Sequence, residues 1–226
     1  MRARTAAAEP SSTGKRRRSM VLVVVTAAAI GFAVPHAWGA VTDNIVPIGD
    51  FDAHEMCRKG GPSSSDTRSR VCQTDNRDVG MYRQGSLSAA QKTRVDQVID
   101  AQFSPTDLVM KWDGSPAYSG DAETDFIYQI GTVKESDDDV VGRAWCDDPI
   151  ENTIKCDQTY IRIENGYVTK KRICHETGHA VGLLHGADAV PELSNSDNRL
   201  GCMEKPSDGG SESLGDNNRD NINSVY

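Results

Sequence analysis

Three histidines, one glutamate and one glycine form a single short pattern, His-Glu-x-x-His-x-x-Gly-x-x-His, at His175, Glu176, His179, Gly182 and His185. Residues four apart lie on one face of a helix, so the first two imidazoles can converge on one metal ion. Imidazole nitrogen is a common ligand of Zn²⁺, and three protein ligands leave the fourth tetrahedral position open to water, as in catalytic zinc sites. The pattern therefore predicts a hydrolytic zinc centre held by the three histidines.

The glutamate and the glycine of this pattern have separate predicted roles. Glu176 follows the first histidine, so its carboxylate can reach a metal-bound water rather than the metal and act as a general base. Gly182 can adopt a positive φ without a Cβ clash, which lets the helix end and the chain turn, bringing His185 back as the third ligand. The alternative is an incidental cluster on a surface helix. Against it, nearby apolar residues indicate a buried helix: Ile173, Ala180, Val181, Leu183 and Leu184.

The elements that must position this pattern follow from hydrophobic spacing and turn residues. The zinc helix is expected at residues 170–182 and a last helix at residues 217–226. An earlier helix begins at Ser88, where Gln91 completes a capping box, and ends at Pro105. Short apolar runs between Gly, Asp and Pro clusters predict five strands, at residues 79–84, 108–112, 125–130, 140–145 and 159–163. This order predicts an α+β domain with a small sheet.

The N-terminal residues differ in composition from the rest of the chain. Residues 1–39 contain a basic run at residues 15–18 and an apolar stretch at residues 20–34. Small residues at Ala37 and Gly39 fit cleavage after Gly39, so a signal peptide is predicted, compatible with general or twin-arginine export. An uncleaved membrane anchor is the alternative, but the stretch is shorter than the roughly 20 residues that a span needs.

The charge of the chain argues against one class of function. The chain of 226 residues has a formal net charge of −8, and since residues 1–39 carry +5, residues 40–226 carry −13. A nucleic-acid-binding surface needs clustered Lys and Arg, so no nucleic-acid partner is expected.

All six cysteines lie in the predicted exported part of the chain. An even number in an oxidising compartment predicts three disulfides, although six cysteines allow fifteen pairings. A cysteine-based metal site is the competing interpretation, but the sequence has no Cys-x-x-Cys pair. Proximity in the sequence favours two bonds and leaves a third: Cys57–Cys72, Cys146–Cys156 and Cys174–Cys202.

The extended histidine pattern resembles that of the metzincin zinc peptidases, in which a methionine turn follows it. Met203 is the methionine that the resemblance implies, the alternative being an ordinary core residue; in the family it lies beneath the metal and is not a ligand. The predicted Cys174–Cys202 bond would join the residue before His175 to the residue before Met203. It would hold the methionine turn against the zinc helix.

The C-terminal residues resemble the last helix of matrixin catalytic domains, Leu-x-x-Asp-Asp-x-x-x-Ile-x-x-Leu-Tyr. The matching positions, with Asn in place of Asp, are Leu214, Asn217, Asn218, Ile222, Val225 and Tyr226. The resemblance covers residues 79–226 and implies a metzincin-like zincin fold, a small twisted mixed sheet with an active-site helix, a Met-turn and a C-terminal helix. It also implies that a substrate strand pairs with an edge strand, for which residues 140–145 are the candidate.

Several features depart from well-known subfamilies. Gly186 follows His185, Lys205 stands where some subfamilies place a tyrosine, and the segment between His185 and Met203 is long for a matrixin. That segment shapes the S1′ pocket in the family, so substrate preference is not carried over. Matrixins also bind Ca²⁺, for which the acidic runs at residues 137–139 and 147–148 are weak candidates.

The combined expectation is a secreted, extracellular zinc endopeptidase with one catalytic Zn²⁺, acting as a monomer on a protein or peptide substrate. No stable membrane association is expected after signal cleavage. The alternative is a zinc-stabilised extracellular binding module without hydrolysis, which has no use for Glu176. Residues 40–78 are expected to be an N-terminal arm or a short pro-segment, and residues 79–226 the catalytic domain.

Overall fold

The structure, a computed structural model, describes residues 41–48, 56–120, 122–133, 140–205 and 209–226. The predicted signal peptide, residues 1–39, and the acidic run at residues 137–139 lie outside the described residues. Among the helices that are described, none combines the length and apolar character needed to cross a membrane.

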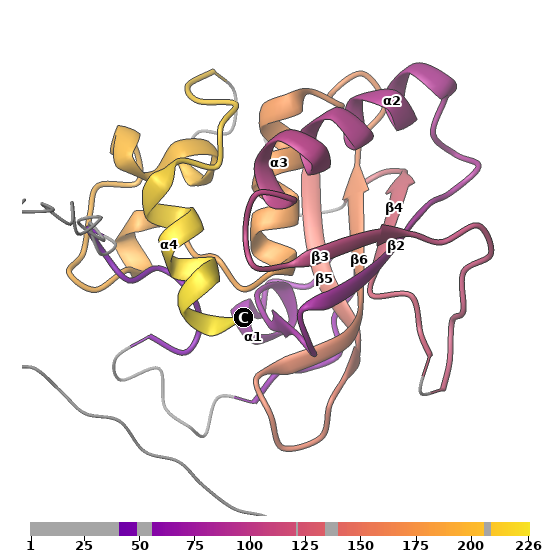
Figure 1. Cartoon of the computed structure of the whole chain (residues 1–226), viewed down its shortest axis with the longest axis horizontal. Helices are drawn as coiled ribbons and strands as arrows, with labels where there is room; N and C mark the ends of the chain where they lie inside the picture. The colour runs from indigo at the N-terminus through magenta and orange to yellow at the C-terminus, as the bar shows by residue number, and fades with distance from the viewer. Residues whose placement is uncertain (1–40, 49–55, 121, 134–139, 206–208) are drawn as a thin grey trace, which may run out of the picture. The chain divides into compact units, whose positions relative to one another are not determined.

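A six-stranded sheet forms the centre of the fold (Figure 1). Its strands are β1 (Gln73–Thr74), β2 (Asp78–Arg83), β3 (Val109–Trp112), β4 (Phe126–Ile130), β5 (Gly142–Pro149) and β6 (Lys155–Ile163). The order β1-β6-β4-β2-β3 is parallel throughout, and β5 runs antiparallel to β6. The chain thus has the mixed α and β structure and the small mixed sheet that the sequence predicts.

Three longer helices accompany the sheet: α2 (Ala89–Val98), α3 (Lys170–Ala180) and α4 (Asp216–Val225). Figure 1 shows α2 beside α3, and α3 packs against β5 and β6. The shorter helices are α1 (Thr67–Arg70), the π-helix η1 (Ile99–Phe103) and the 3₁₀ helices η2 (Gly186–Asp188) and η3 (Asn198–Met203). Apolar side chains from α2, α3, η3 and the sheet share one core.

The capping box expected at the start of α2 is present. The Ser88 hydroxyl accepts a hydrogen bond from the Gln91 amide at 3.3 Å, and the Gln91 side chain accepts one from the Ser88 amide at 2.8 Å. Both bonds satisfy amides that the first helical turn leaves unpaired.

Strands β5 and β6 extend further than the sequence predicts. β5 continues to Pro149 rather than ending at residue 145, and β6 begins at Lys155 rather than at residue 159. The Cys146–Cys156 disulfide joins the two strands, and register shifts near Asp148 keep them paired through residues that form strands poorly. Strand propensity alone therefore underestimates both strands.

The described N-terminal residues are folded onto the rest of the chain. Residues 41–48 belong to the same compact unit as the other described residues, and Ile45 is buried in the main core. Among the described residues, all six cysteines are paired, in the bonds Cys57–Cys72, Cys146–Cys156 and Cys174–Cys202. These are the same pairs that sequence proximity favours.

Candidate metal centre

Helix α3 carries the first two histidines on one face. It begins after Thr169, whose side chain accepts a hydrogen bond from the Arg172 amide at 3.2 Å and so caps the first turn. The helix ends at Ala180, and Gly182 has a φ of +99°. A side chain at Gly182 would be strained in this conformation, so the glycine makes the turn towards His185, as predicted.

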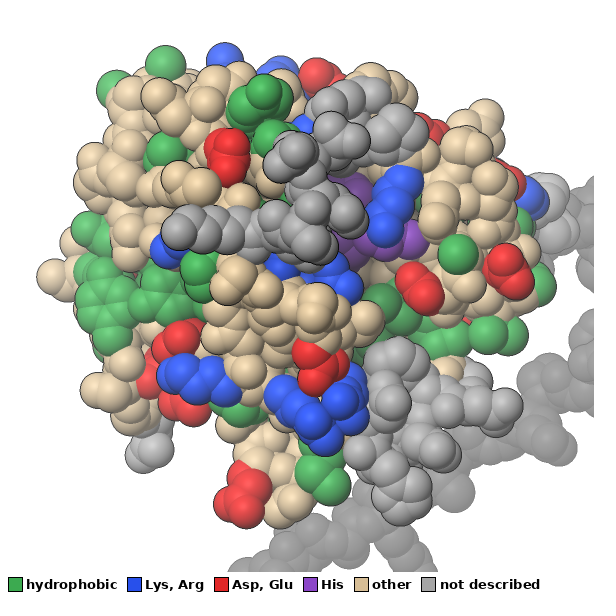
Figure 2. Space-filling model, turned by 180° about the vertical axis from the view of Figure 1, so that it is seen from behind, with side chains coloured by type: hydrophobic (Ala, Val, Ile, Leu, Met, Phe, Trp, Pro, Cys, Tyr) green, Lys and Arg blue, Asp and Glu red, His purple; other side chains and the backbone are tan. Residues whose placement is uncertain are grey.

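The three histidine rings converge through their Nε2 atoms. His175 Nε2 lies 3.2 Å from His179 Nε2 and 3.2 Å from His185 Nε2. His175 and His179 are buried, whereas His185 is partly exposed. On the face shown in Figure 2, histidine side chains are visible with Lys and Arg side chains beside them. Part of the cluster is therefore exposed at the surface.

The hydrogen bonds of two rings fix their tautomers. His175 Nδ1 lies 2.8 Å from the carbonyl oxygen of Cys202, and His179 Nδ1 lies 2.7 Å from the carbonyl oxygen of Leu183. A carbonyl oxygen only accepts, so both Nδ1 atoms carry hydrogen and both Nε2 atoms of the neutral rings carry lone pairs. Two lone pairs at this distance cannot hydrogen-bond to each other and repel unless a cation lies between them.

The donor set fits a zinc ion. Tetrahedral Zn²⁺ with Zn–N bonds of about 2.0–2.1 Å places its ligand nitrogens about 3.3 Å apart, close to the separations in this cluster. A backbone carbonyl, like a carboxylate or a water, is a common partner of the second ring nitrogen of a zinc-bound histidine, because it orients the ring and selects the tautomer. His175, His179 and His185 are therefore the residues that would hold the metal.

Burial keeps these imidazoles neutral. Loss of solvent lowers the pKa of His175 to about 4, opposed by the hydrogen bond to Cys202 and reinforced by the charges of Arg172 and Lys171. Burial also lowers the pKa of His179 and of His185, and the neighbouring histidines add to the effect. Metal binding requires unprotonated rings, so this environment favours it.

Glu176 lies on α3, and its carboxylate reaches β5 at Gly142. Its side chain is buried, and a Cβ atom placed on Gly142 would come within 2.7 Å of Glu176 Oε1, so the absence of a side chain on Gly142 makes room for the carboxylate. Burial raises the pKa of Glu176 to about 7, while the charges of Arg172 and Arg143 and the backbone amide of Ala144 favour the ionised form. A carboxyl that titrates near neutrality suits proton transfer in either direction.

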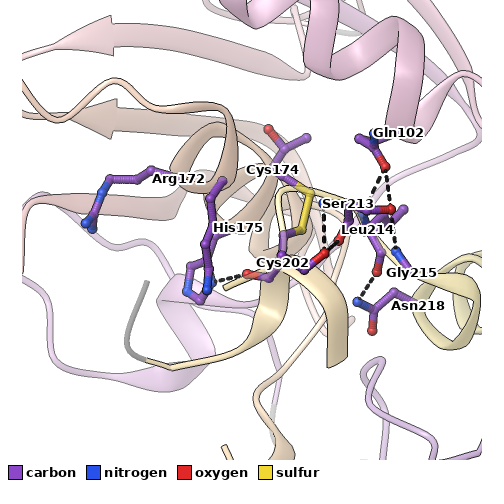
Figure 3. The surroundings of a disulfide bond; sticks show 12 residues. Gln102, Arg172, Cys174, His175, Cys202, Ser213, Leu214, Gly215 and Asn218 are labelled. Carbon is purple, nitrogen blue, oxygen red and sulfur yellow. Dashed lines mark hydrogen bonds between the residues drawn. A yellow bond between two sulfur atoms is a disulfide. The ribbon is translucent and has the colours of Figure 1, made fainter. Parts of the chain in front are cut away.

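Met203 packs directly against α3. It is fully buried, and a Cβ atom on Gly178, between the two helical histidines, would overlap Met203 Sδ. Figure 3 shows the Cys174–Cys202 disulfide beside the bond between His175 and Cys202. Met203 therefore packs against α3 between His175 and His179, and its assignment as the methionine of a Met-turn stays a prediction.

Two features of this site are not evident in the sequence pattern. Arg143 lies on β5 and exerts its charge on Glu176 across the helix–strand contact. Asn44 is completely buried and contacts the loop before His185. A lone asparagine in a polar, turn-rich stretch forms no sequence pattern. The repeated asparagines of α4, at Asn217, Asn218 and Asn221, are the one sequence signal that this helix has polar partners.

A second group of acidic side chains lies apart from the pattern. Glu123, Asp148 and Asp157 offer carboxylate oxygens within 4.8 Å of one another, and one residue of the predicted acidic run, Asp148, belongs to this group. Exposed acidic groups often occur without an ion, so the calcium expectation stays a prediction. Cys57, Cys72 and Cys146 also lie close together but are disulfide-bonded and cannot act as thiolate ligands.

Comparison with known proteins finds similar solved structures at low sequence identity. No family model and no curated protein sequence matches the chain. Metalloproteinase-II from Bacteroides fragilis is similar in structure with a TM-score of 0.39 and 10% identity, over 75% of this chain and 56% of that protein. Myroilysin is similar with a TM-score of 0.35 and 12% identity, over 79% of this chain and 72% of that protein. This chain thus spans little more than half the length of the Bacteroides protein.

Proposed function

We propose that the chain is a secreted zinc-dependent endopeptidase of metzincin type, similar to matrixins. The observation that carries the proposal is the convergence of His175, His179 and His185, with two rings held as Nδ1–H tautomers by backbone carbonyls. Such an arrangement suits a metal ion and leaves room for a fourth, exchangeable ligand.

The catalytic chemistry is divided between the ion and Glu176. A bound Zn²⁺ would polarise the scissile carbonyl and acidify a water molecule. Glu176 would take a proton from the attacking water and pass it to the leaving amine, a transfer that its pKa of about 7 favours at neutral pH. The Ala144 amide and the charge of Arg143 would favour the ionised carboxylate before it takes the proton and after it has passed the proton on.

The outer edge of β5 is the proposed docking site for an extended substrate. The carbonyl of Cys146 already accepts a hydrogen bond from the Gly60 amide at 2.7 Å. We therefore restrict the pairing to the start of the strand, near Gly142, where β5 adjoins Glu176. This segment is narrower than the one proposed from sequence, residues 140–145.

An extracellular location suits the three disulfides. Three disulfides fit an oxidising environment, and the leader at residues 1–39 would direct the chain there. We propose that residues 79–226 form the catalytic domain and that residues 40–78 remain attached as an arm. Protein or peptide chains are the proposed substrates.

A peptide-library digest tests the proposed function. Zinc-loaded protein should cleave internal peptide bonds, and a chelator should abolish cleavage. Glu176→Gln should retain zinc but lose at least about 100-fold in kcat/KM, the usual range for loss of a general base. Glu151→Gln, in the exposed turn between β5 and β6, is the matched control and should cleave normally.

Two outcomes would overturn this proposal. Full cleavage by Glu176→Gln would remove the glutamate from the mechanism. A zinc-loaded, disulfide-intact protein that cleaves nothing in the library would favour the zinc-stabilised binding module.

A further inference from the structure

Residues 42–46, which we call the N-terminal clamp, run along the loop that leads to the third histidine. The Leu184 amide donates to the Asn44 carbonyl at 2.7 Å, and the Val46 amide donates to the Gly182 carbonyl at 2.9 Å. The clamp therefore pairs with the chain immediately after α3 ends.

The clamp also holds the chain on the far side of His185. The Asp43 amide donates to the Val190 carbonyl at 2.9 Å, and the Val190 amide donates to the Asp43 carbonyl at 2.8 Å. His185 is thus flanked by two points of backbone pairing, both supplied by residues more than 130 positions earlier in the chain.

Asn44 joins this loop to the C-terminal helix. Its side chain is completely buried, and Nδ2 donates to the Leu184 carbonyl and to Asn218 Oδ1, both at 3.0 Å. Its Oδ1 accepts from Asn217 Nδ2 at 3.2 Å and from Asn221 Nδ2 at 2.6 Å. Both donors and both acceptor sites of the amide are used, so the side chain is fixed in one orientation.

The loop held in this way serves two ligands. His185 is the one histidine of the cluster that does not lie on α3, so its distance from the other two depends on the loop. Leu183, which forms a bridge with Ile45 of the clamp, supplies the carbonyl that orients His179. Partners of this kind, one step removed from the metal, commonly change metal affinity when they are lost.

We propose that the N-terminal clamp is part of the metal site and that Asn44 is a positioning residue for His185. This inference rests on the metal-binding half of the proposed function and is independent of hydrolysis. It assigns a role in metal binding to residues far from the histidine pattern in sequence.

Zinc affinity, measured by competition with a chromophoric chelator, tests the role of Asn44. Asn44→Ala should weaken zinc binding about 10–100-fold and alter the visible spectrum of the Co²⁺-substituted protein. Leu87→Ala, which removes a buried side chain before α2, is the control for a general loss of stability. It should lower the melting temperature without changing either metal readout.

Hydrogen exchange of the unaltered protein gives a second test that does not depend on a variant folding. Coupling between two sites is reciprocal, so zinc should slow exchange of the paired amides of Asp43, Val46, Leu184 and Val190. The inference would be overturned if folded Asn44→Ala bound zinc with wild-type affinity. It would also be overturned if zinc left the exchange rates of these four amides unchanged. Either result could occur in an active peptidase, so it would leave the proposed function standing.

Discussion

The carbonyl oxygen of Cys202 accepts a hydrogen bond from the ring of His175, while the sulfur of the same cysteine is bonded to Cys174, the neighbour of His175. One residue thus fixes both the backbone beside the first proposed ligand and the tautomer of its ring. Cys202 is held in turn by its own amide, which donates to the Ser213 carbonyl at 2.7 Å (Figure 3). The segment that contains Cys202 is therefore tied to α3 by one disulfide and one hydrogen bond.

Removing this disulfide should weaken metal binding as well as stability. The double variant Cys174→Ser/Cys202→Ser should lose about 3 kcal/mol of unfolding free energy, the order expected for opening a loop of this size. Its zinc affinity should fall at least about 10-fold because the carbonyl of Cys202 is no longer held against His175. Denaturant unfolding and chelator competition measure the two effects.

The matched control is Cys146→Ser/Cys156→Ser, whose disulfide joins β5 to β6 and lies in a separate cluster with Cys57 and Cys72. It should lose a similar amount of stability and keep its zinc affinity. Equal zinc affinity in both double variants would show that the Cys174–Cys202 bond has no part in positioning the ligand.

Packing between Gly178 and Met203 should be intolerant of a single methyl group. In Gly178→Ala the new Cβ atom overlaps Met203 Sδ, so we expect a loss of about 1–3 kcal/mol from overpacking, together with weaker zinc binding. Gly85→Ala, where a Cβ atom meets no other atom within 4 Å, is the control and should be nearly neutral.

A double variant tests whether the methionine is the cause. Met203→Ala removes the obstructing sulfur, so adding it to Gly178→Ala should cost less than the sum of the two single changes. Strict additivity in thermal unfolding would indicate that the two residues do not share a packing contact.

Asp125 gives the folded chain a pH dependence unrelated to the metal. The residue is 6% exposed, its Oδ2 accepts from the Gly80 amide at 2.7 Å, and its Oδ1 accepts from the Thr74 hydroxyl at 3.3 Å. Burial, followed by the adjacent carboxyl of Asp75, raises the pKa of Asp125 to about 8. The unfolded state releases the proton of this carboxyl near pH 4, so between about pH 4 and pH 8 only the folded state holds it.

Stability from Asp125 should be present at acid pH and lost as pH rises through about 8. Wild-type protein should melt several degrees lower at pH 9 than at pH 6. Asp125→Asn, whose amide can donate as the protonated carboxyl does, should show a flatter dependence of melting temperature on pH. Asp100→Asn, at an exposed position, is the control, and a slope unchanged by Asp125→Asn would contradict this assignment.

Local sequence signals predict the elements that depend on local chemistry. The capping box at Ser88 fixes the start of α2, and the turn at Gly182 fixes the end of α3. Strand β4 is predicted almost to the residue because its apolar run is buried in the centre of the sheet. In each case the decisive contacts lie within a few residues along the chain or follow from burial of a continuous run.

Elements that depend on distant contacts are not predictable in this way. Residues 42–46 form only isolated bridges and buried side-chain hydrogen bonds, neither of which produces a repeating pattern. β1 has two residues and is held by its pairing with β6. The histidine pattern identifies the proposed ligands, but the polar residues that position them, Asn44 above all, are evident only in the folded chain.

Anomalous diffraction at the zinc edge, from crystals of the zinc-loaded protein, tests the central claim most directly. We predict one strong peak about 2.0–2.1 Å from the Nε2 atoms of His175, His179 and His185. Absence of a peak between these three rings, or a strong peak only at Glu123, Asp148 and Asp157, would contradict the proposed zinc centre.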